Sequence, residues 1–281
     1  MNRGTLFDRL TRGVRWAWLA EPHRSALPSD LADSVMSIDS RDRFHAKQGR
    51  STARVRFDGA DGSKLSVYLK RHDKLPWFSR LAAVLDSSKG HTPASVEWSH
   101  LERARSLGIP VPEVVAAGEW VGPWGKLRGF LMVKELVGAD ELNVALPRLA
   151  ESLPADVFGR FKRELIREMA QIIARLHGSS HFHKDLYLCH FFLDGDTNRP
   201  AGSRLTLIDL HRLAEHRWTA VRWRWKDLGQ LLYSSAGVAG IDDRDRLRFW
   251  LRYRKLSRLK SPKTQLRAVR EKARRYLEHN T

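Results

Sequence analysis

Two acidic residues and a histidine in the second half of the chain are of the types that transfer phosphoryl groups. Asp185 lies within the polar segment His183–His190, with the sequence HKDLYLCH, and Asp209 ends the apolar run LTLID at residues 205–209. Phosphoryl transfer from ATP needs one carboxylate to orient a hydroxyl nucleophile. It needs a second carboxylate and a neighbouring ligand to hold Mg²⁺ on the phosphates. The pattern therefore predicts Asp185 as the catalytic carboxylate, and Asp209 with His190 as metal ligands.

A hairpin in the first half of the chain ends on a lysine of the kind that contacts phosphates. Apolar and polar residues alternate over 53–57 and again over 65–70, and turn-forming residues at 58–62 separate the two runs. The second predicted strand ends at Lys70. The preceding stretch 47–52 holds a single glycine, which is a weak signal for a phosphate-cradling loop.

The rest of the first half predicts one helix and more strands. A helix over 95–107 carries Glu97, and Gly108 follows it as a C-cap. The remaining features are a polar connector, two strands and a glycine hinge, expected at 72–90, 114–120, 129–136 and Gly138.

The second half of the chain is predicted to be mainly helical. An amphipathic helix over 158–177 precedes the loop that carries Asp185, because its apolar residues recur at helical spacing. Two short strands and two further helices are expected at 191–193, 205–210, 223–236 and 242–280.

Composition and charge limit the classes of protein and partner. The chain has 281 residues, of which 42% are hydrophobic and 9% aromatic, as in folded domains with a substantial core. Lys plus Arg at 50 against Asp plus Glu at 32 leaves a net charge of +18, which favours polyanionic partners. The single cysteine, Cys189, has no partner for an internal disulfide, and its apolar neighbours favour an inert thiol over a nucleophile.

The basic N-terminal residues 1–35 contain two tryptophans and two prolines, and they permit two interpretations. One is a loosely packed N-terminal extension, and the other is an interfacial anchor in which Trp16 and Trp18 lie beside Arg12 and Arg15. No run approaches the ~20 apolar residues of a membrane span, and no continuous apolar signal core begins the chain. We therefore expect a cytoplasmic protein that can touch a membrane surface.

The phrases around the two aspartates resemble a known family. The order of elements resembles the protein-kinase-like fold, and HKDLYLCHF at residues 183–191 resembles the catalytic phrase of the lipopolysaccharide core heptose kinases, the bacterial Kdo/heptose kinases. Ile208–Arg212, with the sequence IDLHR, resembles their metal-binding phrase, and Lys226–Leu228 matches a later K-D-L phrase. The resemblance covers about residues 40–240 and implies an α+β fold with a small β-rich N-lobe and a mainly helical C-lobe.

The resemblance also implies roles for the residues that act on ATP and Mg²⁺. Asp185 would accept or orient the proton of a sugar hydroxyl, and Asp209 would chelate Mg²⁺ between the phosphates. His190 stands where most kinases have a metal-binding asparagine. It would bind the metal or, because Mg²⁺ prefers oxygen, hold Asp185 or a phosphate by hydrogen bonding. Lys70 would pair with the phosphates, and Glu97 would hold Lys70.

Supporting roles are implied for five further residues. Glu135, at the hinge, is assigned to nucleotide binding, and His183 is expected to pack in the loop and bond backbone. Asp227 would lie beneath the catalytic loop and brace its amides, or else be a helix-surface aspartate. His211 and Arg212 would face a substrate phosphate or carboxylate, although Arg212 could equally be a surface charge.

The family resemblance implies an anionic, lipid-linked glycan acceptor at the inner face of the bacterial inner membrane. A basic surface suits both such a glycan and anionic lipid, since each Lys or Arg near a charged bilayer contributes on the order of 1 kcal/mol. Trp218, Trp223 and Trp225 interleave with basic residues, so this strip is either an acceptor or membrane surface or a core helix with a basic exposed side. The predicted organisation is an N-terminal basic arm, an N-lobe and a C-lobe at 1–35, 36–134 and 135–281.

Other functions remain open at the level of sequence. A kinase fold with a small-molecule or protein acceptor, or an inactive scaffold, would retain the same elements. A nucleic-acid-binding protein would explain the charge but not the aspartates, and no nucleic-acid motif is present. Zinc is not expected, because one cysteine and the spacing of the histidines fit no common ligand set. Those histidines are His177, His181, His183, His190 and His211.

Overall fold

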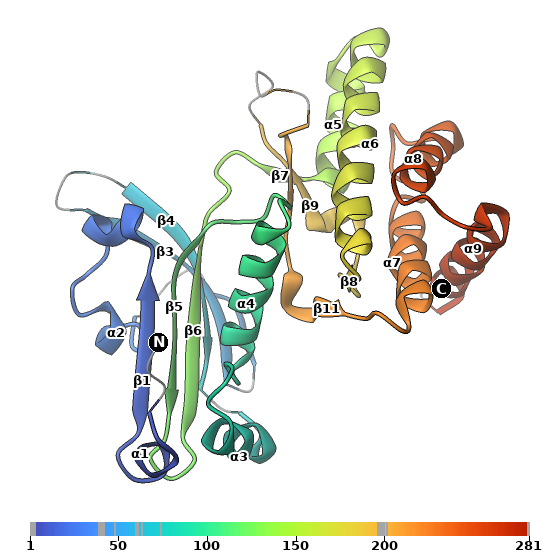
Figure 1. Cartoon of the computed structure of the whole chain (residues 1–281). Coiled ribbons are helices and arrows are strands. Elements are labelled where there is room, and N and C mark those ends of the chain that lie inside the picture. The colour runs from blue at the N-terminus through green and yellow to red at the C-terminus, as the bar shows by residue number, and fades with distance from the viewer. Residues whose placement is uncertain are drawn as a thin grey trace. The chain divides into compact units, whose positions relative to one another are not determined.

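The computed structural model describes residues 4–38, 49–59, 62, 64–73, 75–195, 200 and 202–279, and the backbone of 43–47. The chain forms two compact units (Figure 1). Unit 1 comprises residues 1–102 and 112–135, and unit 2 comprises 103–111 and 136–281. The predicted C-lobe begins at residue 135, whereas unit 2 takes up the chain after Glu135 and also includes residues 103–111. The predicted arm 1–35 belongs to unit 1.

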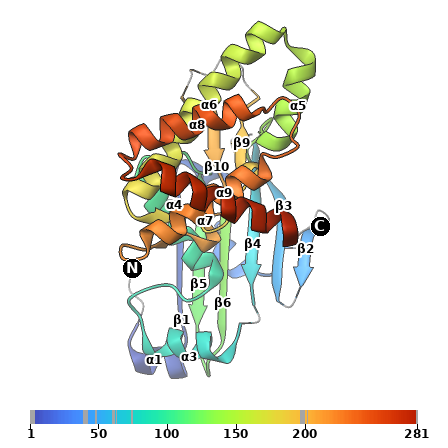
Figure 2. The same cartoon turned by 90° about the vertical axis from the view of Figure 1, so that its right-hand side faces the viewer.

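An antiparallel sheet forms the body of unit 1. Its strands lie in the order β1-β5-β6-β4-β3-β2, which Figure 2 shows edge to edge. In that order the strands are β1 (Val14–Leu19), β5 (Val114–Val121), β6 (Leu127–Lys134), β4 (Lys64–His72), β3 (Arg50–Asp58) and β2 (Arg43–Lys47). The predicted hairpin is confirmed as β3 and β4, paired from Arg50 with His72 to Asp58 with Lys64. Its turn falls partly on residues outside the described part of the chain.

The two faces of the sheet carry different residues because side chains alternate along a strand. On one face Val67 and Leu69 of β4 join a buried cluster with Phe130 and Met132 of β6. The 3₁₀ helix η1 (Glu21–Ala26) and helix α2 (Leu31–Ser34) contribute Ala26, Leu31 and Val35 to that cluster. Lys70 alternates with Leu69, and its side chain meets helix α4 (Pro93–Ser106).

Two expectations for unit 1 need correction. Residues 14–19 are not part of a loose arm or a membrane anchor, because β1 pairs with β5 and the Trp16 and Trp18 rings lie 5.3 and 5.7 Å from that of Trp98. The connector 72–90 is not only polar coil, since it contains helix α3 (Trp77–Leu85). The glycine-poor stretch 47–52 forms the end of β2 and the start of β3, with Gly49 at φ 80°, and Gln48 lies outside the described residues.

Unit 2 is mainly helical (Figure 1). Its helices are α5 (Leu142–Ser152), α6 (Ala155–Gly178), α7 (Ala220–Ser234), α8 (Asp243–Leu256) and α9 (Pro262–His279). Short strands form the sheets β10-β9-β7 and β11-β8. They are β7 (Asp140–Glu141), β8 (His181–Phe182), β9 (Phe191–Leu193), β10 (Leu205–Leu207) and β11 (Ala214–Glu215).

Helix α6 forms much of the core of unit 2. The expected amphipathic pattern is present, and Leu165, Ile173 and Leu176 are among its buried residues. Fully burying such a side chain contributes about 1.5–3 kcal/mol to stability. Helix α6 packs against α8, and α7 packs against α9.

The predicted single helix over 242–280 is instead the pair α8 and α9. The chain leaves helical geometry between them, where Arg258 and Ser261 have φ values of 47° and 52° and Pro262 begins the new helix. The break turns α9 back onto α7, so that Gly229 meets Lys272 and Ala273 closely. Within the described residues, no helix combines the length and apolar character needed to cross a bilayer.

Candidate active site

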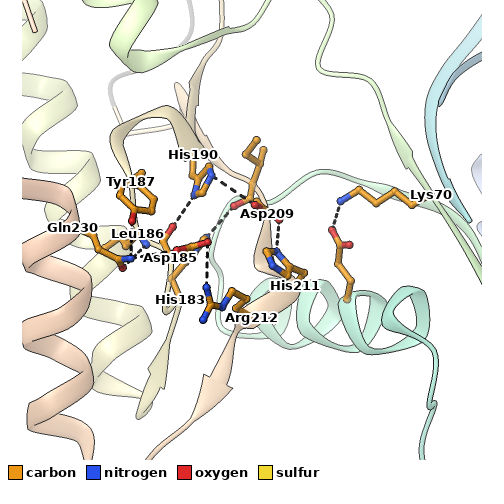
Figure 3. Close-up of polar contacts among 12 residues, drawn as sticks. Lys70, His183, Asp185, Leu186, Tyr187, His190, Asp209, His211, Arg212 and Gln230 are labelled. Carbon is orange, nitrogen blue, oxygen red and sulfur yellow. Dashed lines mark hydrogen bonds and ion pairs between the residues drawn. The ribbon is translucent and has the colours of Figure 1, made fainter. Parts of the chain in front are cut away.

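Lys70 and Glu97 form an ion pair within unit 1. Lys70 Nζ, whose side chain is labelled in Figure 3, lies 2.5 Å from Glu97 Oε1. The glutamate is buried, while the lysine is partly exposed. Strand β4 fixes the lysine and helix α4 fixes the glutamate. A lysine held in this way presents a cationic ammonium group in one place, which suits a contact with nucleotide phosphates.

Glu135, at the end of unit 1, binds an arginine in the structure. Arg54 donates to Glu135 Oε2 from Nε at 3.0 Å and from Nη2 at 2.9 Å, and Glu135 N donates to Ser66 O at 2.9 Å. Glu135, which directly follows β6, is therefore linked to strand β3 through its carboxylate. Its assignment to nucleotide binding stays a prediction.

Asp227 of helix α7 lies beneath the loop that carries Asp185. Its fully buried carboxylate accepts hydrogen bonds from the backbone amides of His183 and Lys184, both at 2.8 Å. His177 Nε2 lies 3.2 Å from the same carboxylate, and its Nδ1 lies 2.7 Å from the Tyr253 hydroxyl. Burial lowers the pKa of His177, so the neutral imidazole is the form that the core contains.

Gln230 also positions the loop, and the sequence analysis missed it. Its Oε1 accepts from Leu186 N at 3.2 Å, and its Nε2 donates to Asp185 Oδ1 at 3.2 Å and contacts the Tyr187 hydroxyl at 3.1 Å. One turn further along α7, the Ser234 hydroxyl accepts from Leu188 N at 2.8 Å. Asp227, Gln230 and Ser234 share one helix face, since residues three, four and seven apart lie together. Polar residues three and seven positions after Asp227 of the K-D-L phrase were the sequence signal that could have identified Gln230 and Ser234.

The carboxylate of Asp185 has a different neighbour at each oxygen (Figure 3). Gln230 donates to Oδ1, while Arg212 Nη1 lies 3.7 Å from Oδ2. The Asp185 side chain is 23% exposed, so it is held by protein on one side and open on another. This arrangement orients a carboxylate that can accept a proton from a bound hydroxyl.

His190 and Asp209 are close enough to share a cation. His190 Nδ1 lies 2.7 Å from the carbonyl oxygen of Asp185, which assigns the ring proton to Nδ1 and leaves the Nε2 lone pair free to bind. His190 Nε2 lies 3.6 Å from Asp209 Oδ2. A carboxylate and an imidazole, completed by phosphate oxygens and water, fit Mg²⁺, which protein usually holds through only one or two side chains.

His183 joins the Asp185 loop to the strand that carries Asp209. Its fully buried ring lies with Nε2 3.0 Å from the carbonyl oxygen of Ile208 and stacks on His190 at 5.5 Å. Burial lowers the pKa of His183, with the Ile208 carbonyl opposing that shift. Because the neutral ring is favoured, His183 fits a structural link between the two phrases and not a cationic contact with phosphate.

Asp209 adopts a backbone conformation that is rare for residues other than glycine. Its φ and ψ of 61° and 50° are left-handed, and such conformations cost on the order of 1–3 kcal/mol and cluster at functional sites. The conformation turns the chain from β10 into the 3₁₀ helix η3 (Leu210–Arg212). His211 Nδ1 then lies 2.5 Å from Asp209 Oδ1, while Oδ2 faces His190.

Positive charge gathers beside the catalytic loop. Lys226 Nζ donates to Lys184 O at 2.5 Å, and burial followed by the charge of Arg212 lowers the pKa of Lys226. The Lys184 ammonium lies 4.6 Å from the ring centroid of Trp223, and the cationic groups of Arg222 and Lys226 each lie 5.6 Å from it. The Trp223 ring also stacks on the His216 ring at 4.6 Å. The three tryptophans of this strip differ in exposure. Trp223 and Trp225 are half-buried on α7, and Trp218 is fully exposed.

The remaining candidates for chemistry have little support in the structure. Burial raises the pKa of the Cys189 thiol, which disfavours the nucleophilic thiolate. In the described part of the chain, no group of three or more His, Cys, Asp or Glu residues is placed to hold a metal.

The sequence and the fold of this chain are similar to those of known proteins. The model of the lipopolysaccharide kinase (Kdo/WaaP) family matches residues 41–253. The lipopolysaccharide core heptose(I) kinase WaaP of Pseudomonas aeruginosa is 31% identical over 213 residues, which cover 75% of this chain and 75% of the relative. WaaP of Escherichia coli is 32% identical over 208 residues, or 73% of this chain and 75% of the relative.

A solved structure described as WaaP in complex with acyl carrier protein has the same fold. It aligns with a TM-score of 0.68 and 28% identity, covering 92% of this chain and 98% of that chain. The predicted α+β, protein-kinase-like fold is therefore confirmed. The matched residues include the HKDLYLCHF and IDLHR phrases and both members of the Lys70–Glu97 pair. This chain belongs to the lipopolysaccharide kinase (Kdo/WaaP) family.

Proposed function

We propose that this protein is an ATP-dependent kinase that phosphorylates a hydroxyl of a heptose, or of a related acidic sugar such as Kdo, in the inner core of lipopolysaccharide. Family membership identifies it as a kinase of a lipopolysaccharide core sugar. The observation that carries the finer proposal is the grouping in unit 2 of a carboxylate oriented for a nucleophile, Asp185, with a two-ligand cation site at His190 and Asp209.

In the proposed reaction, the acceptor hydroxyl attacks the γ-phosphorus of ATP. A new oxygen–phosphorus bond forms as the bond to the ADP oxygen breaks, and the hydroxyl proton passes to Asp185 Oδ2. Lys70, held by Glu97, would pair with the phosphates of the nucleotide. Asp209 and His190 would hold Mg²⁺, which neutralises charge on the phosphates when it is bound. Arg212 would leave Asp185 Oδ2 and contact an anionic group of the acceptor or the transferred phosphoryl group.

The test is transfer of the labelled γ-phosphate of ATP onto extracted core glycans, with mass mapping of the product. We expect the wild-type chain to transfer phosphate in the presence of Mg²⁺. Asp185→Asn should lower turnover by about 10³-fold or more while the protein stays folded, because the amide cannot accept the proton. Asp156→Asn is a matched control, since that side chain is 68% exposed on α6.

Several results of this assay would contradict the proposal. Equal activity of Asp185→Asn and wild type would exclude Asp185 as the catalytic carboxylate. Phosphate transfer to a protein or small molecule but to no core glycan would change the acceptor. Mg-ATP binding without any turnover would identify an inactive scaffold.

We further propose two associations that would accompany this activity. The chain would bind peripherally to the inner face of the inner membrane, where a lipid-linked acceptor is found. It would also bind an acyl carrier protein, by analogy with the WaaP complex. An apolar cavity of about 410 Å³ in unit 2, lined by residues such as Leu142, Met169 and Leu231, has the character of a site for an aliphatic group. Co-expression with an acyl carrier protein and analysis of the purified complex by native mass spectrometry would test this.

A further inference from the structure

Helix α3 in unit 1 is apolar on both of its sides. Ala83 and Val84 are buried in a cluster with Val121 of β5 and Leu127 of β6. The opposite side carries Trp77 at 72% exposure and further exposed residues, which are Phe78, Leu81 and Leu85. A surface helix ordinarily places polar residues outward, so this outer side is made to contact something other than water.

Two neighbouring segments extend the same apolar surface. Helix α1 (Leu6–Thr11) exposes Phe7 and Leu10 and contacts α3. Trp124, in the turn between β5 and β6, is 82% exposed, and its backbone N–H donates to Leu10 O at 3.0 Å. Figures 1 and 2 both show α1, α3 and the β5–β6 turn at one end of the sheet. We call the outer sides of α1 and α3, together with Trp124, the apolar tip.

Basic residues are frequent in the segments that form the apolar tip. Residues 4–15, 75–89 and 121–128 contain seven Lys or Arg residues, of which Arg9 is buried, and two Asp residues. Three of the basic residues, Arg15, Lys126 and Arg128, line a pocket of about 240 Å³ next to Gly122, where Arg15 pairs with Asp33. Lys126, two residues after Trp124, and Arg128 are both exposed, so positive charge lies close to Trp124 along the chain.

We propose that the apolar tip is a docking surface for an anionic lipid bilayer. The tryptophan and phenylalanine side chains would enter the boundary between head groups and acyl chains, where aromatic rings are favoured. Lys126 and Arg128 would contact lipid phosphates at the same depth. This proposal adds a residue-level surface to the proposed peripheral binding, but it depends on unit 1 alone.

Charge favours a bilayer over a second copy of the chain. A symmetric dimer through the apolar tip would bring the basic residues of both copies together, and like charges at an interface oppose association. An anionic membrane instead gains from each Lys or Arg near its surface, on a chain whose net charge is +18.

The test is sedimentation of the full chain with vesicles of phosphatidylcholine, with or without phosphatidylglycerol. We expect binding to the anionic vesicles that falls as salt is added, because salt screens the basic residues. Trp77→Ser with Phe78→Ser should lower the partition coefficient at least ~tenfold, through lost apolar burial. Lys126→Glu with Arg128→Glu should weaken binding strongly at low salt and little at high salt.

The matched control replaces exposed apolar residues outside the apolar tip. Val144→Ser with Val157→Ser in unit 2 removes two exposed valines and should leave vesicle binding unchanged. As a positional readout, brominated lipids should quench part of the tryptophan fluorescence of wild type, and Trp124→Phe should lose part of that quenching.

The proposal would be overturned if the wild-type chain did not bind anionic vesicles, or if Trp77→Ser with Phe78→Ser bound them as well as wild type. It would also be overturned if the wild-type chain were a dimer in solution and the same double variant were a monomer. Vesicle binding requires no catalysis, so its failure is distinct from failure of the kinase proposal. Conversely, the double variant should phosphorylate a detergent-dispersed acceptor at the wild-type rate and lose activity only on acceptor embedded in vesicles.

Discussion

At the scale of single residues, the site consists of groups whose orientation is set by a neighbour. His190 can offer Nε2 to a cation because its Nδ1 is bonded to the Asp185 carbonyl, and Asp209 reaches the same place because its backbone is left-handed. Asp185 is oriented by Gln230 on one oxygen and by Arg212 near the other. The orientation of each of these side chains therefore depends on a network of contacts. Each contact contributes little alone, and the network can stabilise the arrangement by more than the sum of its pairs.

Substitution of Gln230 should test whether this residue orients Asp185. Gln230→Leu should lower kcat about ten- to a hundredfold with little change in the KM for ATP, because one hydrogen bond to Asp185 is worth about 1–3 kcal/mol when its loss leaves a polar group unpaired. Gln230→Glu should in addition move the acidic limb of the pH–rate profile upward, since a second carboxylate beside Asp185 disfavours its ionised form.

The control for Gln230 is Gln171→Leu, which removes an exposed glutamine from α6. A purely structural role for Gln230 would lower the fraction of folded protein and leave the pH–rate profile of the remaining enzyme unmoved. That result would contradict the assignment of Gln230 as a positioning residue.

At the scale of elements, helix α7 holds the loop that carries Asp185, and α9 packs against α7. The α7 face that includes Asp227, Gln230 and Ser234 bonds four backbone amides of the loop between His183 and Leu188. Helices α7 and α9 approach each other closely at Gly229. A Cβ added there would lie 2.7 Å from Lys272 Cβ and 3.4 Å from Ala273 N. Glycine is needed here for helix approach and not for an unusual backbone angle.

Gly229→Ala should therefore destabilise the protein. Alanine stabilises a helix by about 1 kcal/mol relative to glycine. Overpacking of α7 against α9 typically costs about 1–3 kcal/mol, and we expect this cost to exceed the gain. Urea unfolding of the two proteins measures the difference in the free energy of unfolding. The matched variant is Gly159→Ala in α6, where the nearest atom is the mobile end of Arg163 at 3.6 Å, and it should stabilise by about 0.5–1 kcal/mol.

At the scale of the whole molecule, buried histidines make stability depend on pH. Burial, followed by the charge of Arg50, lowers the pKa of His72 to about 4, and burial also lowers the pKa values of His177 and His183. In the unfolded chain a histidine takes up a proton near pH 6.5. Between about pH 6.5 and 4 the unfolded state then binds more protons than the folded state, so acid favours unfolding. Above pH 6.5 both states are neutral at these sites and the dependence vanishes.

The free energy of unfolding should fall as the pH is lowered from about 6.5 to 4. His72→Gln should reduce that slope by up to about 1.4 kcal/mol per pH unit, because it removes one linked proton. Denaturant unfolding at several pH values measures the slope. His279→Gln, at an exposed position near the end of α9, should leave it unchanged, and an equal slope in wild type and His72→Gln would contradict the linkage.

Much of the fold was predictable because local patterns dictated it. Alternation specified the β3–β4 hairpin that carries Lys70, and helical spacing specified α6. The phrases HKDLYLCHF and IDLHR led to the family, since each contains several of the candidate site residues within a short segment. The elements that the sequence did not predict include β1, α3, α5 and the break between α8 and α9. Strand β1 is set by its pairing with β5, and α3 shows apolar residues on both sides.

By itself the sequence determined the family and the residues that are candidates for catalysis, because residue identity within a short segment is local information. Only the tertiary structure decided how those groups are held. Gln230 lies 45 residues from Asp185 along the chain yet bonds its carboxylate, and the Nδ1 contact of His190 follows from the turn of the loop. Tertiary packing also placed Trp16 and Trp18 against Trp98, and it left exposed the apolar tip that we propose as a membrane surface. Burial depends on which elements pack together, and that depends on contacts between residues far apart in the sequence.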